Sequence, residues 1–189
     1  MASGNVDMAQ VGALCHEVAE GHGLLLYDVE LLTERGRTVL RVFVDRPGGS
    51  EPGQGATVDD CESVARELGQ MLDVSEELIP IAYALEVSSP GVERPLKRED
   101  HYRWAEGQLV QLVLGENVEG QNTYRGVLAG FAEGVVQLRV QPPPKNWKKG
   151  QRRSVSPVDS WQMVEIPLGV IRRAQMVYDP DYGVPDQES

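Results

Sequence analysis

The hydrophobic pattern of the first half of the chain changes between helical and extended periods. Residues 5–20 carry apolar side chains at helical spacing, after the candidate N-cap Asn5 and before two glycines. Residues 24–32 and 38–45 alternate with a period of two around a Glu-Arg-Gly turn, which predicts a β-hairpin. The residues expected on the inner face of this hairpin are Leu25, Tyr27, Val29, Leu31, Leu40, Val42 and Val44.

A second helix and a third strand follow. Thr57 is expected to begin the helix, with Asp60 placed to close a capping box and an apolar stripe over residues 61–72. Residues 46–56, with two prolines and four glycines, are predicted to be a flexible loop. Residues 83–89 alternate again as a strand. The order helix, strand, strand, helix, strand predicts a two-layer α+β domain over residues 1–96.

The second half of the chain has a different pattern, with short strands at close spacing from residue 109. The candidate strands are residues 109–114, 124–131, 135–140, 163–166 and 170–177. They predict a small SH3-like or Sm-like β-barrel over residues 108–178, after a linker at 97–107 that contains a short helix. Residues 179–189 are expected to form a flexible tail.

The strand at 83–89 ends abruptly at the sequence Ser-Pro-Gly. Proline fixes its own φ and glycine tolerates positive φ, so residues 89–92 are predicted to form a type II turn. Such a rigid turn suits a docking surface, and it equally suits a plain corner between domains; both interpretations stay open. The candidate partner-binding residues are Ser88, Ser89, Pro90, Gly91, Glu93, Arg94 and Pro95.

The formal net charge of −11 is distributed unevenly. Residues 1–100 hold 19 acidic and 8 basic side chains, whereas residues 101–189 hold ten of each. An acidic half repels a phosphate backbone, so broad binding to nucleic acid through this half is disfavoured. The alternative is that the charge serves only solubility.

One segment of the chain is strongly basic. It lies within residues 141–161, an insertion between two predicted strands. Cations can contact phosphates and an indole can stack on an unpaired base, so this loop is a candidate RNA contact; the alternative is a solvated loop without a role. The residues concerned are Lys145, Trp147, Lys148, Lys149, Arg152 and Arg153.

Catalytic chemistry finds little support in the sequence. His16, His22 and His101 belong to no nucleophile or metal motif and are expected at surface or cap positions. Cys15 and Cys61 lack metal-binding spacing and are expected to be reduced residues of an apolar core. We therefore expect no enzyme, no cofactor and no metal. No apolar run approaches the roughly 20 residues that span a bilayer, and the N-terminus lacks signal-peptide features, so a cytoplasmic location is expected.

Four segments together resemble the bacterial ribosome maturation factor RimP family. They are TVDDCESVARELGQMLD, LEVSSPGVERPL, YRGVLAG and VEIPLGVIRRAQMV, within a similarity that runs from about Val11 to about Tyr178. The resemblance implies an α+β domain joined to an SH3-like barrel. It also implies a non-catalytic factor that binds the immature small ribosomal subunit through a basic ribosomal protein and adjacent rRNA.

Two departures from the family limit what the resemblance implies. Family members usually join the strands around residues 141–161 by a short turn, so the resemblance implies no role for that insertion. At residues 120–125 the family often has several basic residues, and this chain keeps only Arg125 as a candidate RNA contact. We expect a monomer. The alternative function is a free-standing RNA-binding or hydrolytic protein that uses the barrel mouth.

Overall fold

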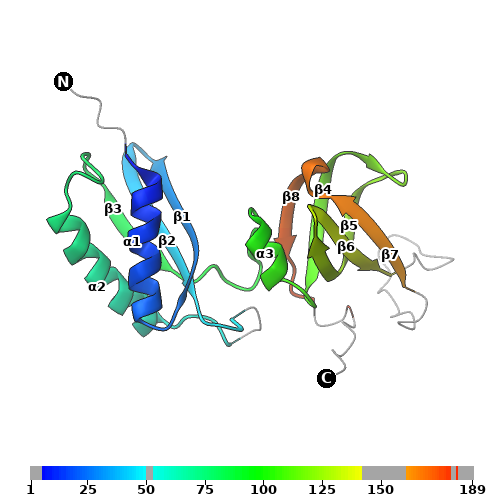
Figure 1. The fold of residues 1–189 in the computed structure, drawn as a ribbon, viewed down its shortest axis with the longest axis horizontal. Coiled ribbons are helices and arrows are strands. Elements are labelled where there is room, and N and C mark those ends of the chain that lie inside the picture. The colour runs from blue at the N-terminus through cyan, green and yellow to red at the C-terminus, as the bar shows by residue number, and fades with distance from the viewer. Residues whose placement is uncertain (1–5, 50–52, 142–160, 180–181, 183–189) are drawn as a thin grey trace. The chain divides into compact units, whose positions relative to one another are not determined.

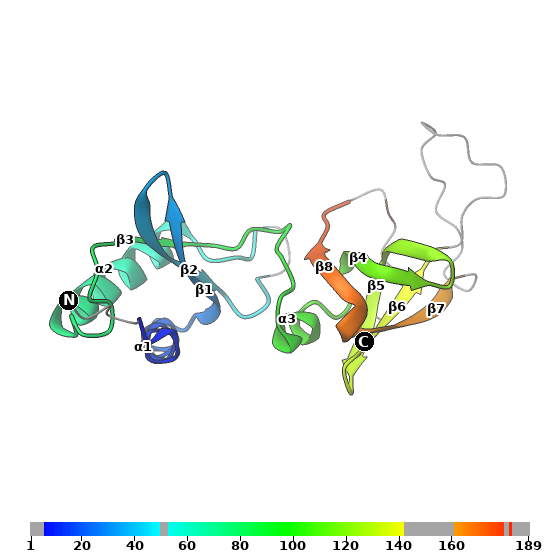
Figure 2. The ribbon, with the colours of Figure 1, turned by 90° about the horizontal axis from the view of Figure 1, so that it is seen from above.

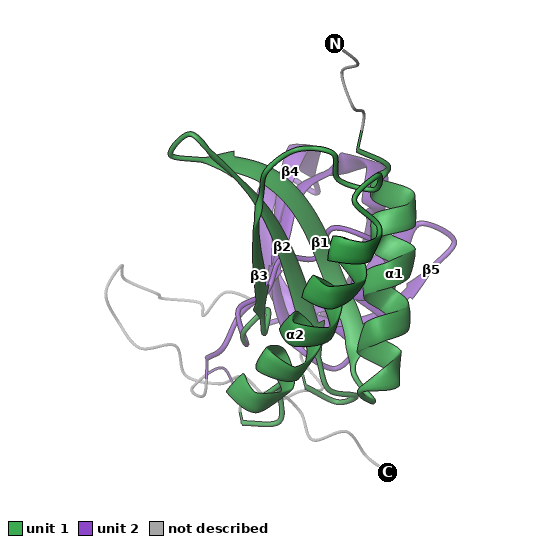
Figure 3. Cartoon of the chain, turned by 90° about the vertical axis from the view of Figure 1, so that its left-hand side faces the viewer, with its two compact units in different colours: residues 1–91 green, residues 92–189 purple. Residues whose placement is uncertain are grey.

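A computed structural model describes residues 6–49, 53–141, 161–179 and 182. The chain divides into two compact units, Met1–Gly91 and Val92–Ser189, which are coloured separately in Figure 3. The predicted boundary lay at residue 96. In the described residues both units combine helix and sheet, so the α+β class is confirmed.

The first unit is a three-stranded sheet with two helices on one face (Figures 1 and 3). The strand order is β1-β2-β3, with β1 antiparallel and β3 parallel to the central strand β2. The parallel pairing makes α2 the crossover between β2 and β3. The elements are α1 (Met8–Gly21), β1 (Leu25–Glu34), β2 (Arg37–Asp45), α2 (Val58–Val74) and β3 (Ala84–Ser88).

Polar caps fix the starts of both helices. Thr57 Oγ1 accepts a hydrogen bond from Asp60 N at 3.2 Å, and Asp60 Oδ2 accepts one from Thr57 N at 2.8 Å, which confirms the capping box. The cap of α1 is Asp7, whose Oδ1 accepts from the backbone of Ala9 at 3.1 Å. The prediction of Asn5, which lies outside the described residues, was wrong because the helix begins three residues later, at Met8.

A β-bulge changes which residues of β1 face the core. Leu26 pairs with Val44 and Asp28 pairs with Phe43, so the register shifts at Tyr27. Leu26 therefore packs against the core of the unit, and Leu25 is not part of it. The predicted inner position of Leu25 was wrong because a bulge reverses the alternation of side chains. The remaining partly or fully buried positions of the hairpin core are Leu24, Val29, Leu31, Leu40, Val42 and Val44.

The loop between β2 and α2 is anchored at both ends. Asp45 is buried and accepts hydrogen bonds from Arg46 N at 3.0 Å and from Ala56 N at 3.1 Å. The Arg46 side chain in turn donates to Asp60 at 2.9 Å. The prediction of a flexible loop was therefore wrong for these ends, because one buried carboxylate binds the backbone of both.

The second unit is a five-stranded antiparallel sheet with one short helix (Figures 1 and 2). The strand order is β7-β6-β5-β4-β8, and no pairing in the described residues joins β7 to β8. Closure into an SH3-like barrel therefore stays a prediction. The elements are α3 (Glu99–Trp104), β4 (Leu109–Val118), β5 (Gln121–Ala132), β6 (Val135–Val140), β7 (Gln162–Pro167), the 3-10 turn η2 (Leu168–Val170) and β8 (Ile171–Met176).

Helix α3 belongs to the core of the second unit. Tyr102 is 2% exposed and stacks on Phe131 with ring centroids 5.5 Å apart. His101 is fully buried, and its Nδ1 accepts a hydrogen bond from Lys97 N at 3.0 Å. The expectation of a surface or cap position for His101 was wrong, because the segment predicted as a linker packs its helix against the sheet.

Candidate functional site

The first unit carries the whole net charge of the chain. Its 91 residues include sixteen Asp and Glu against five Lys and Arg, a formal charge of −11. The second unit has thirteen of each, a formal charge of zero. The structural division gives the same two net charges as the sequence halves, and it assigns the acidic character to one folded unit.

The face of the three-stranded sheet that the helices leave uncovered has a charged centre. The strand register places Glu30 of β1 and Glu86 of β3 on either side of Arg41 in β2. Paired residues lie on the same side of a sheet, and Arg41 alternates with the core residues Leu40 and Val42. These charged side chains therefore lie on the face opposite the helices.

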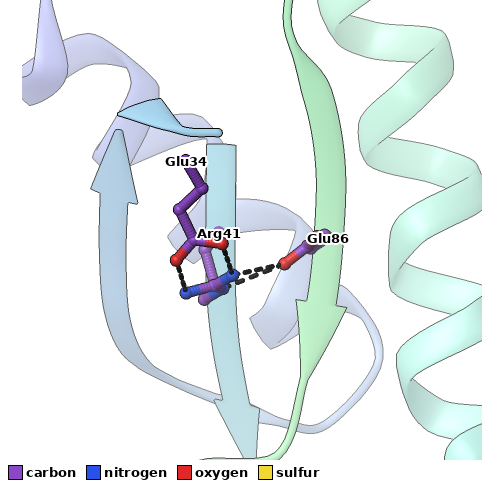
Figure 4. Close-up of polar contacts among 3 residues, drawn as sticks. All are labelled: Glu34, Arg41 and Glu86. Atoms are coloured by element: carbon purple, nitrogen blue, oxygen red, sulfur yellow. Dashed lines mark hydrogen bonds and ion pairs between the residues drawn. The ribbon is translucent and has the colours of Figure 1, made fainter. Parts of the chain in front are cut away.

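Arg41 is held between two carboxylates, as Figure 4 shows. Its Nε and Nη2 donate to Glu86 Oε2 at 2.9 and 2.8 Å, and its Nη1 and Nη2 donate to the two oxygens of Glu34 at 3.1 and 3.2 Å. The hydrogen bonds to Glu34 and Glu86 raise the pKa of Arg41 above its ordinary value. The guanidinium is therefore a permanent cation in a fixed orientation.

The Glu34–Arg41–Glu86 cluster leaves a negative surface. Its single cation serves two carboxylates, whose side chains remain 52% and 50% exposed for Glu34 and Glu86. Glu30 adds a further carboxylate in register beside Arg41. Such a face can attract and orient a cationic partner, and it repels phosphate.

Sequence reasoning missed this cluster. Arg41 and Glu86 each alternate with buried apolar residues, which shows that they face outward. The pairing of β3 with β2, however, joins positions 45 residues apart, and no local signal indicated that β2 is central.

The predicted docking turn begins in the first unit. Ser88 ends β3 opposite Phe43, and Ser89 Oγ accepts a hydrogen bond from Gly91 N at 3.3 Å. Gly91 has a φ of 75°, the positive value that the predicted turn requires. Ser88, Ser89 and Pro90 are half-buried, and Gly91 is exposed.

The rest of the predicted docking turn belongs to the second unit. Met176 N donates to Arg94 O at 2.9 Å, and Pro95 bridges to Gln175, so this segment pairs with the edge strand β8. Arg94 is 3% exposed, whereas Glu93 and Pro95 are exposed. The burial of Arg94 favours the domain-corner interpretation for this residue.

Arg125, the candidate RNA contact on β5, is bound by C-terminal residues. Its Nη2 lies 2.6 Å from Asp179 Oδ2, and its guanidinium lies over the ring of Tyr182, 5.2 Å from the centroid. Tyr182 is 4% exposed and its hydroxyl donates to Arg125 O at 2.9 Å. The prediction of a flexible tail is therefore wrong for these two residues, because the ion pair and the buried ring attach them to β5.

The other candidate RNA contacts, residues 145–153, lie outside the described residues. In the described part of the chain, no group of three or more His, Cys, Asp or Glu side chains could hold a metal ion. His16 is exposed on α1, and His22 caps that helix with its Nε2 2.8 Å from Glu67 Oε2, as expected for surface and cap positions.

The comparison with known families matches the acidic unit. Residues 14–93 fit the family model of the RimP N-terminal domain. This match supports the assignment of the chain to the RimP family. RimP proteins are non-enzymatic assembly factors, so the match over residues 14–93 indicates a role in ribosome maturation. None of the described helices is long and apolar enough to cross a membrane.

Proposed function

We propose that this protein is a non-catalytic assembly factor for the small ribosomal subunit. It binds the immature particle through a basic ribosomal protein and adjacent rRNA, without a cofactor. The observation that carries the proposal is the coincidence of two features in one folded unit: the RimP N-terminal match at residues 14–93 and the formal charge of −11 over residues 1–91.

The acidic unit is the part that contacts the basic protein. The uncovered sheet face offers Glu30, Glu34 and Glu86 around Arg41, in an arrangement set by the strand register. Ribosomal proteins that bind rRNA are rich in Lys and Arg, and complementary charge both steers their encounter and disfavours wrong partners. The exposed residues Glu93 and Pro95, which belong to the second unit, are separate candidate contacts with the protein partner.

The second unit is the part that contacts rRNA. With a formal charge of zero, this unit does not repel phosphates by its net charge, unlike the first unit. Arg125 and the basic insertion, with Lys145, Trp147, Lys148, Lys149, Arg152 and Arg153, supply the proposed contacts. The proposal includes a closed SH3-like barrel for this unit and a cytoplasmic monomer for the whole chain.

Co-sedimentation with ribosomal particles tests this function. The purified chain is mixed with immature small subunits, with mature small subunits and with naked rRNA, across a series of salt concentrations. We expect binding to the immature particle and little binding to the mature one. Binding to naked RNA alone, with a steep dependence on salt, would instead favour a free-standing RNA-binding protein.

A further inference from the structure

Polar side chains form a row across the five-stranded sheet of the second unit. The register of β4 pairs Gln111 with Gln175 of β8 on one side and with Arg125 of β5 on the other. Gln111 alternates with Val110 and Leu112, which are buried in the core of the unit. Because directly paired residues lie on the same side of a sheet, the row lies on the face opposite that core.

The row continues at the ends of the two remaining strands, with Gln141 directly after β6 and Trp161 directly before β7. β5 pairs Val127 with Arg139 of β6, and the same antiparallel register, continued by two residues, brings Arg125 opposite Gln141. The register of β6 with β7, continued by one residue, brings Gln141 opposite Trp161. The row thus combines three amides, one guanidinium and one indole, on β8, β4 and β5 and on the residues that directly adjoin β6 and β7.

In the part of the chain that the structure describes, two buried donors of this row have no hydrogen-bond partner. They are Arg125 Nε and Gln141 Nε2, and Gln141 as a whole is 6% exposed. Unpaired buried N–H groups destabilise a fold and are uncommon, so each requires an explanation such as an absent ligand. Because both groups are donors, the ligand that fits them is rich in acceptor atoms.

The C-terminal residues supply a partial substitute for such a ligand. Asp179 places a carboxylate on the Arg125 guanidinium, and Tyr182 places a flat ring over it. The Tyr182 ring also meets Trp161 edge-on, with centroids 5.7 Å apart. An anion paired with arginine beside a planar ring reproduces what a nucleotide offers in its phosphate and its base.

We infer that this row is a binding site for single-stranded RNA, and that Asp179 and Tyr182 occupy it in the free protein. RNA enters by displacing these two side chains. Its acceptor atoms then pair with Arg125 Nε and Gln141 Nε2, and a base stacks on Trp161. The choice of RNA as ligand rests on the proposed function.

The test uses a variant of the whole chain in which the two side chains that occupy the site are removed; we call it the opened variant. We compare the wild type with the double variant Asp179→Asn/Tyr182→Ala, using fluorescence anisotropy of a labelled single-stranded RNA of about ten nucleotides. The double variant should bind about tenfold more tightly, as expected when an internal competitor for one stacked base is removed. Adding Arg125→Ala should return the affinity to the wild-type value. The control Glu116→Gln/Tyr178→Ala changes the same residue classes at exposed positions and should leave the affinity unchanged.

A second variant separates binding from folding. Gln141→Leu in the opened variant removes an unpaired buried donor, so it should raise the melting temperature and weaken RNA binding. A lower melting temperature together with unchanged RNA binding would contradict the assignment of Gln141.

The RNA site is refuted if the opened variant binds RNA no more tightly than the control. It is also refuted if the increase in RNA affinity persists after Arg125→Ala is added. A preference of the opened variant for an Asp- and Tyr-containing peptide over RNA would refute it as well. Co-sedimentation of the wild type with immature particles is measured separately. If the wild type does not co-sediment with immature particles, the proposed function is contradicted. The RNA site itself is judged only by the RNA affinities of the variants.

Discussion

We proposed that the uncovered sheet face of the first unit binds a basic ribosomal protein, which we call the acidic-face hypothesis. The Glu34–Arg41–Glu86 cluster allows it to be tested with variants that change the charge of this face in opposite directions. Replacing both glutamates by glutamine removes the two carboxylates that are hydrogen-bonded to Arg41 and changes the formal charge of the cluster from −1 to +1. Replacing Arg41 by glutamine instead changes it from −1 to −2. If the face binds a basic ribosomal protein, the first variant should weaken binding to immature small subunits and the second should strengthen it.

The expected change in binding affinity follows from the solvent exposure of the substituted side chains. Glu34 and Glu86 are about half exposed, so water screens each charge strongly. Exposed charge pairs of this kind alter an equilibrium constant by a factor of about two to five per unit charge. We expect the Glu34→Gln/Glu86→Gln variant to bind about tenfold more weakly and Arg41→Gln to bind about threefold more tightly at low salt. Both differences should shrink as the Debye length falls below about 10 Å.

The assay is a co-sedimentation titration of each variant at about 50 mM and about 200 mM salt, with circular dichroism as a check on folding. The matched control is Glu76→Gln/Glu77→Gln, which removes the same two charges from exposed positions after α2. Equal weakening in the control would mean that net charge, not the sheet face, drives binding. Wild-type affinity for Glu34→Gln/Glu86→Gln would refute the acidic-face hypothesis.

Three further predictions concern the fold. Thr57→Ala removes the capping box and should lower the free energy of unfolding by about 1 kcal/mol in urea titrations, with Thr57→Ser close to the wild type. Gly126→Ala places a Cβ 2.5 Å from a β6 carbonyl oxygen and should cost about 1–3 kcal/mol, whereas Gly12→Ala in open space on α1 should stabilise by about 0.5–1 kcal/mol. Burial raises the pKa of the Cys15 thiol to about 11, so mass spectrometry after alkylation at pH 8 should find Cys61, which is only half-buried, modified first.

Local chemistry determined the elements of this protein. The period of apolar residues located the helices and most strands, and the Thr57 capping box is a contact between residues three apart. The turn between β1 and β2 is equally local: Arg35 and Gly36 both adopt positive φ, as a tight hairpin with right-handed twist requires. The acidic character of the first unit needed only a count of side chains. These features depend on neighbours in the sequence, so the sequence alone predicted them.

Only the tertiary structure decided which distant residues meet. Parallel pairing of β3 with β2 brings Glu86 to Arg41, 45 positions away, and burial of Tyr182 brings Asp179 to Arg125, 54 positions away. The packing of α3 buried His101 in the same way, although no motif marked it. Such contacts form because the whole unit must bury its apolar surface and pair its backbone groups at the same time. The hydrophobic period of one segment does not specify which distant segment it will pack against.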